Sequence, residues 1–533
     1  SSLGSCLAQA GYIDQARYCF DQALRAADEF ENESSKFRAL SSLASSLAQA
    51  TGIENRQPLF DQALKVVKGI ENEEDKSKAL SSLGSCLAQA DYCDQARYCF
   101  DQALRAAEWI KSDLWKPEAL IFIASSLAET TGLENRQSLF DQVLSLAKGC
   151  GKDWQRSKVF SSFGSCLAQT DYDDQTRYCF DQGLRAMERI EDNRLKSQAL
   201  SSFASSLAQA TNLENRQSLF DQALRVGEGI EDDEKISKAL SSLASSVAQT
   251  TGMDDLHSLF DQALRAAEGI GGDREKSEAL SSLASSLAQT TGLENRQSLL
   301  DQALRTAQGI EDEEYSSKAL CSVASSLVQA GKFNQALRTA EGIDNEEYKS
   351  KALSSLGSCL THANYCDQAR YCFEQALRVA DGIENSFEKS QALFLIAESL
   401  EQTTGLEDRE SLFEQALRAA QRMEGNSEKS EALSFLASSL AQVADIENRQ
   451  SLLDQALRAG EGIEDNENRS KALSSLASSI AQTTGMDDLH SSLEQALRVA
   501  DGIVDDDDKF EVLSSIVSSL AEATGIENRQ PLF

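Results

Sequence analysis

The feature that most constrains this chain is a repeat of 40 residues that continues over nearly its whole length. Each unit has an apolar pair at its start, and the second residue of that pair is Leu everywhere except at Phe160. These leucines are Leu40, Leu80, Leu120, Leu200, Leu240, Leu280, Leu320, Leu353, Leu393, Leu433, Leu473 and Leu513. The chain contains about thirteen such units. Their spacing is 40 residues except for one step of 33 residues, from Leu320 to Leu353. Such units bury their apolar faces against their neighbours, so we expect residues 1–533 to form a single repeat array.

Residues 78–110 indicate that each unit is a pair of amphipathic helices. In the first segment the apolar or small residues follow the spacing of one helical face: Ala79, Leu80, Leu83, Gly84, Leu87 and Ala88. The second segment has a similar stripe: Ala96, Cys99, Phe100, Ala103, Leu104, Ala107 and Ile110. The predicted fold class is therefore all-α, an α-solenoid that forms a superhelical array of antiparallel helix-turn-helix repeats.

The shortened unit near residues 321–353 is an internal check on this interpretation. Residues 330–343 match residues 90–110 with the seven residues 97–103 removed. Seven residues make nearly two helical turns, so the apolar stripe stays in phase after the loss. A strand that lost seven residues would instead turn its apolar face outward.

Local signals mark where the helices are expected to begin and end. All three prolines fall in the first turn of an expected helix: Pro58, Pro117 and Pro531. In the alternating type of unit, with residues 131–140 as its example, Asn135 is an expected N-cap. Gly69, Gly229, Gly269 and Gly309 suit helix C-termini, and acidic links precede the next helix. Residue 1 and Phe533 both fall inside expected helices, so both ends are expected to be cut within a repeat.

The unit around residues 80–108 resembles the tetratricopeptide repeat family. The resemblance rests on Leu83-Gly84 in the first helix, on Ala96, Phe100 and Ala103 in the second, and on the turn between them. It recurs around Leu3-Gly4, Phe163-Gly164 and Leu356-Gly357, whereas other units have Ala in place of Gly and Arg in place of Ala96. The 40-residue period is similar to the longer repeats of kinesin light chains. The resemblance implies a right-handed superhelix whose first helices line a concave, peptide-holding groove.

Charge and composition exclude several classes of partner. The chain has 51 Lys and Arg against 85 Asp and Glu, a net charge of −34. Nucleic acid and anionic membranes need a basic surface, so we expect neither as a partner and favour a basic protein. No apolar run reaches the length of a membrane span and no signal peptide is present, which predicts a cytoplasmic location.

The sequence predicts no enzymatic chemistry within these residues. It contains no Ser/His/Asp constellation and no phosphate-binding loop, and we expect no catalytic residue, metal or cofactor. Cys86, Cys93 and Cys99 recur as Cys359, Cys366 and Cys372, but their spacing is not that of a zinc site and no His accompanies them. We interpret them as buried or half-buried residues copied with their repeat.

Two sets of residues are candidates for partner binding. The first is the polar stripe of the first helices, which we expect to be exposed: Ser45, Gln49, Ser81, Ser85, Gln89, Ser125 and Glu129. Ser stands where some members of the resembled family have the Lys and Asn that clamp a ligand's terminal carboxylate, so that clamp is not expected. The second set is Trp109, Trp115 and Trp154, in positions where other units place Gly or acidic residues, such as Gly69, Glu275 and Glu74. Trp115 and Trp154 lie in neighbouring links, where they could pack together or anchor a partner.

These observations favour a non-enzymatic scaffold that binds a protein or peptide, with an extended or repetitive ligand matched to the near-identical units. Two alternatives remain at this stage. The array could be a passive structural spacer, or it could be the sensor or recruitment arm of a larger multidomain signalling or effector enzyme. The sequence leaves the oligomeric state open.

Overall fold

The computed structural model describes residues 2–483 apart from 51, 54, 131–132, 134–135, 171, 251–255, 291–292, 294, 363, 404, 407, 444–445 and 447, together with 509–510 and 513–514. Every regular element in this described part is an α-helix, so the predicted all-α solenoid is confirmed. The chain forms two compact units, Ser1–Ile270 and Gly271–Phe533, which are described in turn.

The described residues of the first compact unit form seven helical hairpins. Their helices are α1 (Ser2–Gln9), α2 (Ile13–Asp28), α3 (Glu33–Gln49), α4 (Gln57–Lys68), α5 (Glu73–Gln89), α6 (Cys93–Trp109), α7 (Trp115–Glu129), α8 (Arg136–Lys148), α9 (Asp153–Leu167), α10 (Asp173–Glu188), α11 (Asn193–Gln209), α12 (Arg216–Glu228), α13 (Asp233–Ala248) and α14 (Leu256–Glu268).

The second compact unit continues the same pattern. Its described helices are α15 (Asp273–Gln289), α16 (Arg296–Gln308), α17 (Glu313–Gln329), α18 (Phe333–Glu341), α19 (Glu346–His362), α20 (Cys366–Gly382), α21 (Ser386–Gln402), α22 (Arg409–Gln421), α23 (Asn426–Gln442), α24 (Arg449–Glu461) and α25 (Asn466–Thr483).

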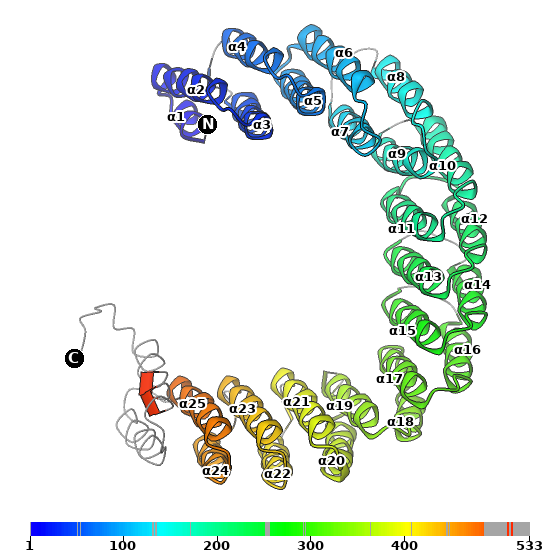
Figure 1. The fold of residues 1–533 in the computed structure, drawn as a ribbon, viewed down its shortest axis with the longest axis vertical. Helices are drawn as coiled ribbons and strands as arrows, with labels where there is room; N and C mark the ends of the chain where they lie inside the picture. The colour runs from blue at the N-terminus through cyan, green and yellow to red at the C-terminus, as the bar shows by residue number, and fades with distance from the viewer. Residues whose placement is uncertain are drawn as a thin grey trace. The chain divides into compact units, whose positions relative to one another are not determined.

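Within each compact unit the hairpins stack into two layers. The first helices pack against one another along the chain, as α5 does between α3 and α7, and we call them the first-helix layer. The second helices form the second-helix layer, and Figure 1 shows it on the outer side of the odd-numbered helices in each compact unit. The apolar stripes predicted in residues 79–110 lie between the layers, where all of their members are buried. Stacking therefore supplies the core that a single hairpin lacks.

One class of hairpin is built on the Leu-Gly pair and a left-handed turn. In the hairpin of α5 and α6, Asp91 has φ 65°, its N–H donates to the Ala88 carbonyl at 3.0 Å and the Tyr92 N–H donates to the Leu87 carbonyl at 2.9 Å. These two bonds form a Schellman motif that ends the first helix. The same backbone conformation recurs at Gly11, Gly331 and Asn364.

In this Leu-Gly class the two helices approach closely because the glycine has no Cβ. A Cβ placed on Gly357 would lie 2.8 Å from the Phe373 ring, and one placed on Gly84 would lie 3.1 Å from the Phe100 ring. The buried Ser350 hydroxyl donates across the same hairpin to the Ala376 carbonyl at 3.2 Å. The glycines therefore allow a large ring from the second helix to rest directly on the first.

The other class of hairpin is closed by a buried or half-buried arginine. In the hairpin of α21 and α22, Arg409 is 5% exposed, and its guanidinium donates to the Leu400 carbonyl at 3.1 Å and to the Thr403 carbonyl. These carbonyls lie at the C-terminal end of α21, where the Leu400 carbonyl also accepts from the Thr403 N–H at 3.3 Å, so the arginine acts as an additional C-cap from the next helix. Arginines in the same position reach back to the preceding helix end in four further hairpins: Arg56, Arg136, Arg296 and Arg449.

Several expected helix ends are confirmed, and two details differ. Pro58 and Pro117 lie in the first turns of α4 and α7, whereas Pro531 and Asn135 lie outside the described residues. Asn215, the counterpart of Asn135, has a left-handed φ of 65° and caps nothing with its side chain, because N-capping needs an extended backbone. Gly69 ends α4 as expected but with φ −77°, so it is not a left-handed cap.

The links between repeats also supply side-chain N-caps, which their acidic composition alone did not reveal. The Asn72 side chain accepts hydrogen bonds from the Glu74 and Asp75 N–H groups at 2.9 and 3.1 Å. Side chains in the corresponding position cap seven further first helices: Asn32, Asp192, Asp232, Asp312, Asn345, Asn385 and Asp465. The links therefore act through specific side-chain caps as well as through charge.

The shortened unit keeps its phase, as predicted. Its second helix α18 has 9 residues, whereas α20 has 17. Ala336 and Ala340 of α18 correspond to Ala96 and Ala107, and both remain fully buried.

Gly357→Val should destabilise the hairpin of α19 and α20 by about 2–3 kcal/mol, because the added methyl groups meet the buried Phe373 ring. Gly382→Val at the end of α20 is the matched control. A Cβ there has no neighbour within 4 Å, so we expect a change within about 0.5 kcal/mol. Amide hydrogen exchange resolved by peptide measures both effects. Equal exchange in α19 for the two variants would contradict this account of the glycine.

Arg409→Ala should lower the free energy of unfolding by about 2–4 kcal/mol, since it removes the guanidinium that donates to the buried carbonyls of Leu400 and Thr403. Arg418→Ala on the same helix removes an exposed pair with Glu414 at 2.6 Å and should cost about 0–1 kcal/mol. Denaturant unfolding monitored by circular dichroism compares the two. If both variants unfold alike, the arginine is not the cap that we describe.

Candidate functional site

The structure divides the predicted polar stripe into exposed and covered parts. Ser45 and Gln49 on α3, Gln89 on α5 and Glu129 on α7 are exposed. Ser125 on α7 is half-buried, and its hydroxyl lies 3.3 Å from the Cys166 sulfur of α9.

The expectation that Ser81 and Ser85 are exposed is wrong. Ser81 is fully buried and Ser85 is 8% exposed. Phe37 of α3 and Phe122 of α7 meet edge to face with ring centroids 6.0 Å apart, although α5 lies between their helices. The pair therefore reaches across α5. Ser161 and Ser354 take the position of Ser81 in two other hairpins with the glycine and are also buried, so burial at this position recurs in that class of hairpin. The continuous Ser stripe is interrupted at this hairpin.

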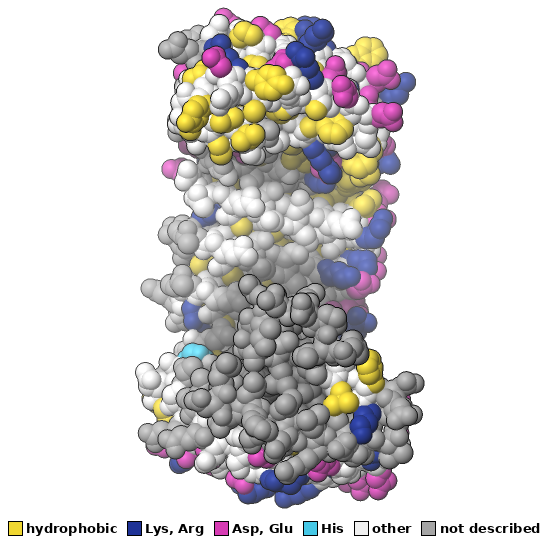
Figure 2. Space-filling model, turned by 90° about the vertical axis from the view of Figure 1, so that its left-hand side faces the viewer, with side chains coloured by type: hydrophobic (Ala, Val, Ile, Leu, Met, Phe, Trp, Pro, Cys, Tyr) yellow, Lys and Arg dark blue, Asp and Glu magenta, His cyan; other side chains and the backbone are white. Residues whose placement is uncertain are grey.

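Figure 2 shows one face of the molecule, on which hydrophobic side chains gather at the upper end of the view. In the middle of this face the described surface is largely uncharged, and charged side chains follow its right-hand edge. Leu3, Tyr12, Tyr18 and Phe30 of the N-terminal helices are exposed.

A second exposed group surrounds the link between α6 and α7, and we call it the tryptophan edge: Trp109, Leu114, Trp115 and Trp154. Trp109 is 71% exposed, Leu114 52% and Trp115 47%, while Trp154 at the start of α9 is half-buried. Trp109 is the last residue of α6, Leu114 lies in the link, and Trp115 and Trp154 lie in the first turns of α7 and α9, so the backbone of the helix ends positions each side chain.

Polar contacts hold the two neighbouring links of the tryptophan edge together. Lys152 Nζ lies 3.4 Å from Asp113 Oδ2, and the Gln155 amide donates to the Asp113 carbonyl. Lys158 on α9 pairs with Glu118 on α7. Among the ring contacts of the described residues, however, none joins Trp115 to Trp154. The predicted proximity of the links is confirmed, but the tryptophans do not pack on each other.

A small cavity adjoins Trp154 in the first-helix layer. Its volume is about 200 Å³, and it is lined by Trp154 and Lys158 of α9 with Leu195, Gln198, Ala199 and Ser202 of α11. It is large enough for one apolar side chain beside the indole ring. The sequence did not reveal it because Leu195 belongs to the next repeat.

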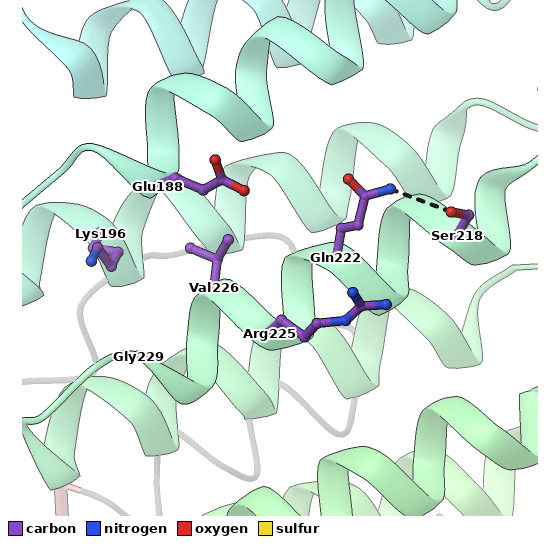
Figure 3. A pocket seen from close by; sticks show the side chains of 7 residues that line it. All are labelled: Glu188, Lys196, Ser218, Gln222, Arg225, Val226 and Gly229. Carbon is purple, nitrogen blue, oxygen red and sulfur yellow. Dashed lines mark hydrogen bonds between the residues drawn. The ribbon is translucent and has the colours of Figure 1, made fainter.

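Another cavity, of about 570 Å³, lies between α10 and α12 in the second-helix layer. Figure 3 shows Val226 at its centre, with Glu188, Lys196 and Arg225 around it and the Gln222 amide bonded to Ser218 at 3.3 Å. Three successive helices contribute to this cavity, so inspection of one repeat could not reveal it. The only sequence signal is Val226, in a position where α6 has Ala106.

Burial makes most of the thiols unreactive. Burial raises the pKa of the Cys99 thiol to about 12 and that of Cys372 to about 12. Cys366, which was expected to be at least half-buried, is instead exposed at the start of α20. Among the described residues no group of His, Cys, Asp and Glu side chains could hold a metal ion.

Comparison with known proteins establishes no family for this chain. No family model matches it, and no curated protein matches it. Solved structures with some similarity include Ton1535 from Thermococcus onnurineus NA1, with 16% identity over 74% of this chain and 98% of that one, at a TM-score of 0.26. The Kap95:Nup1 complex has 13% identity over 96% of this chain and 69% of that one, at a TM-score of 0.42. Yeast Tom70 has 13% identity over 92% of this chain and 97% of that one, at a TM-score of 0.25. Likenesses this weak carry no argument about function.

The described helices contain no stretch that is both long and apolar enough to cross a membrane.

Alkylation with iodoacetamide at neutral pH should label Cys6 and Cys366 and leave Cys99 and Cys372 unlabelled, because the first two are exposed and the others are buried thiols with raised pKa values. Raising the pH through the ordinary thiol range should leave Cys99 protected in the folded chain. Unfolding in denaturant is the control that makes all twelve cysteines reactive. Peptide mass spectrometry measures the order in which the cysteines are alkylated. Labelling of Cys99 as early as Cys6 would contradict the packing described.

Proposed function

We propose that this chain is a non-enzymatic, tetratricopeptide-like interaction array in the cytoplasm, and that the tryptophan edge anchors a protein or peptide partner. The observation that carries the proposal is the exposure of Trp109 and Trp115 in a chain with only 3 tryptophans, all of which belong to this edge. Large exposed apolar side chains rarely gather in one place unless a partner covers them.

The edge has the features of an interaction hot spot. Indole rings bury a large apolar area at low entropic cost, and Trp is enriched among residues whose removal costs the most binding energy. The cavity beside Trp154 can take one apolar side chain, while the paired Lys158 and Glu118 form a polar border. A short peptide with one apolar anchor and flanking polar groups matches this arrangement.

The rest of the first-helix layer supports an extended ligand. Ser45, Gln49, Gln89 and Glu129 remain exposed in a row of neighbouring first helices and offer hydrogen-bonding groups at the repeat interval. The net charge of −34 would steer a basic partner toward the array. The tryptophan edge would then fix where that partner lies.

Replacing the tryptophans with residues from the same positions of other units should abolish anchoring without changing the fold. Gly69 corresponds to Trp109, Glu275 to Trp115 and Ser427 to Trp154. The variant W109G/W115E/W154S should therefore lose the peptides that a random display library enriches on the wild-type chain. We expect each enriched peptide to bind at least about tenfold more weakly by isothermal titration calorimetry.

Phe387→Ser is the matched control, because Phe387 is 58% exposed and occupies the position of Trp154 in the second compact unit. It should leave peptide affinity unchanged. Tryptophan emission of the wild-type chain should shift to shorter wavelength on binding, since all tryptophans lie at the edge. The proposed anchor would be rejected if peptide binding left the emission of the wild-type chain unchanged and the triple variant bound the peptides with unchanged affinity. The passive spacer would then be the better interpretation.

A further inference from the structure

We propose that the array has a second docking site in the second-helix layer, at the notch left by the short helix α18, and that this notch holds an acidic peptide segment of a protein partner. The notch is a cavity of about 430 Å³. Its principal lining residues are Lys332, Phe333, Gln335 and Arg338 of the α18 hairpin, with Tyr365 and Gln368 of the next. The site does not depend on the tryptophan edge.

The deletion that shortens α18 also changes the charge of the layer. In second helices such as α2, α14 and α22, an acidic residue precedes the corresponding arginine by four positions and pairs with it, as Asp21 does with Arg25 at 2.8 Å. In α18 the residue four positions before Arg338 is Asn334, a neutral amide. The loss of residues 97–103 from the repeat thus removes the usual acid and keeps the cation.

Carboxylates near the notch are bonded to other groups. Asp301 accepts a hydrogen bond from the Gln335 amide at 2.6 Å, and Glu341 accepts one from the Tyr371 hydroxyl at 3.3 Å. Among the ion pairs of the described residues, none involves Lys332 or Arg338. Two exposed cations therefore face the notch in a strongly acidic chain, and they provide charge complementarity for carboxylates.

An aromatic wall lies beside these cations. The rings of Phe333 and Tyr365 have centroids 5.2 Å apart, and Tyr365 is 47% exposed. Lys332 itself takes the place of a tyrosine in the other left-handed turns, at Tyr12 and Tyr92. The notch thus combines two cations, an apolar wall and the amides of Gln335 and Gln368.

This combination favours an acidic peptide over other anions. Glu or Asp side chains would accept charge-assisted hydrogen bonds from Lys332 and Arg338, and a neighbouring apolar residue would cover the rings. A nucleic acid would place many more phosphates against a chain of net charge −34, and two cations cannot offset that repulsion. A small inorganic anion would leave the aromatic wall uncovered.

The test uses a display library with alternating acidic and apolar residues, and it compares each selected peptide with the same sequence carrying Gln and Asn for Glu and Asp. We expect the chain to bind the acidic form and to bind the neutral form at least about tenfold more weakly by fluorescence anisotropy. The variant K332Y/R338Q should lose this preference. Tyr at position 332 recreates the Gly11-Tyr12 turn, so the fold should be retained.

Arg378→Gln on α20 is the matched control, because Arg378 is the corresponding exposed arginine of the next hairpin and donates to Gln375 at 3.1 Å. It should leave binding unchanged. Inorganic phosphate at matched ionic strength should displace the peptide no better than chloride. Displacement by phosphate alone, or equal binding by K332Y/R338Q and the wild-type chain, would overturn the proposal. The W109G/W115E/W154S variant should bind the acidic peptide normally.

Discussion

The structure depends on how the last carbonyl groups of each first helix find hydrogen-bond donors. A helix leaves four carbonyls without internal partners, and these ends lie against the core of the array, where water cannot serve them all. One class of hairpin meets the need with a left-handed residue such as Asp91, whose turn returns backbone N–H groups to the helix end. In the other class an arginine at the start of the second helix donates to these carbonyls through its guanidinium, as Arg409 does.

The two solutions have different consequences for packing. A left-handed turn leaves room for close pairing, so Gly357 accepts the Phe373 ring and Ser350 bonds across its own hairpin. In two arginine hairpins the corresponding serine bonds forward instead: Ser277 donates to the Tyr315 carbonyl of the next first helix at 2.7 Å, and Ser197 donates to the Lys235 carbonyl at 2.8 Å. In these hairpins the serine links neighbouring units, whereas Ser350 links the two helices of one unit.

The sequence predicted the helices well because helical periodicity is a local property. The buried stripe of residues 79–110 and the phase of the shortened unit follow from spacing alone. The arginine caps could not be predicted, since an arginine in the position of Ala96 shows nothing of the carbonyls it will reach. Ser81 was misjudged because its position is buried in the closely paired glycine hairpins, as it is at Ser161 and Ser354, and that burial depends on how the helices pack. The cavity beside Trp154 likewise needs Leu195 of the next repeat.

Specificity in an array of near-identical units has to come from the units that differ. A ligand that contacted only repeated positions could bind equally well after a shift of one unit, because each hairpin offers the same groups at the same interval. The tryptophan edge occurs once in the described repeats, and so does the notch at α18. Each breaks the translational symmetry by a different route, the edge by adding apolar side chains and the notch by removing an acid. A partner that used either site would have one register on the array rather than many.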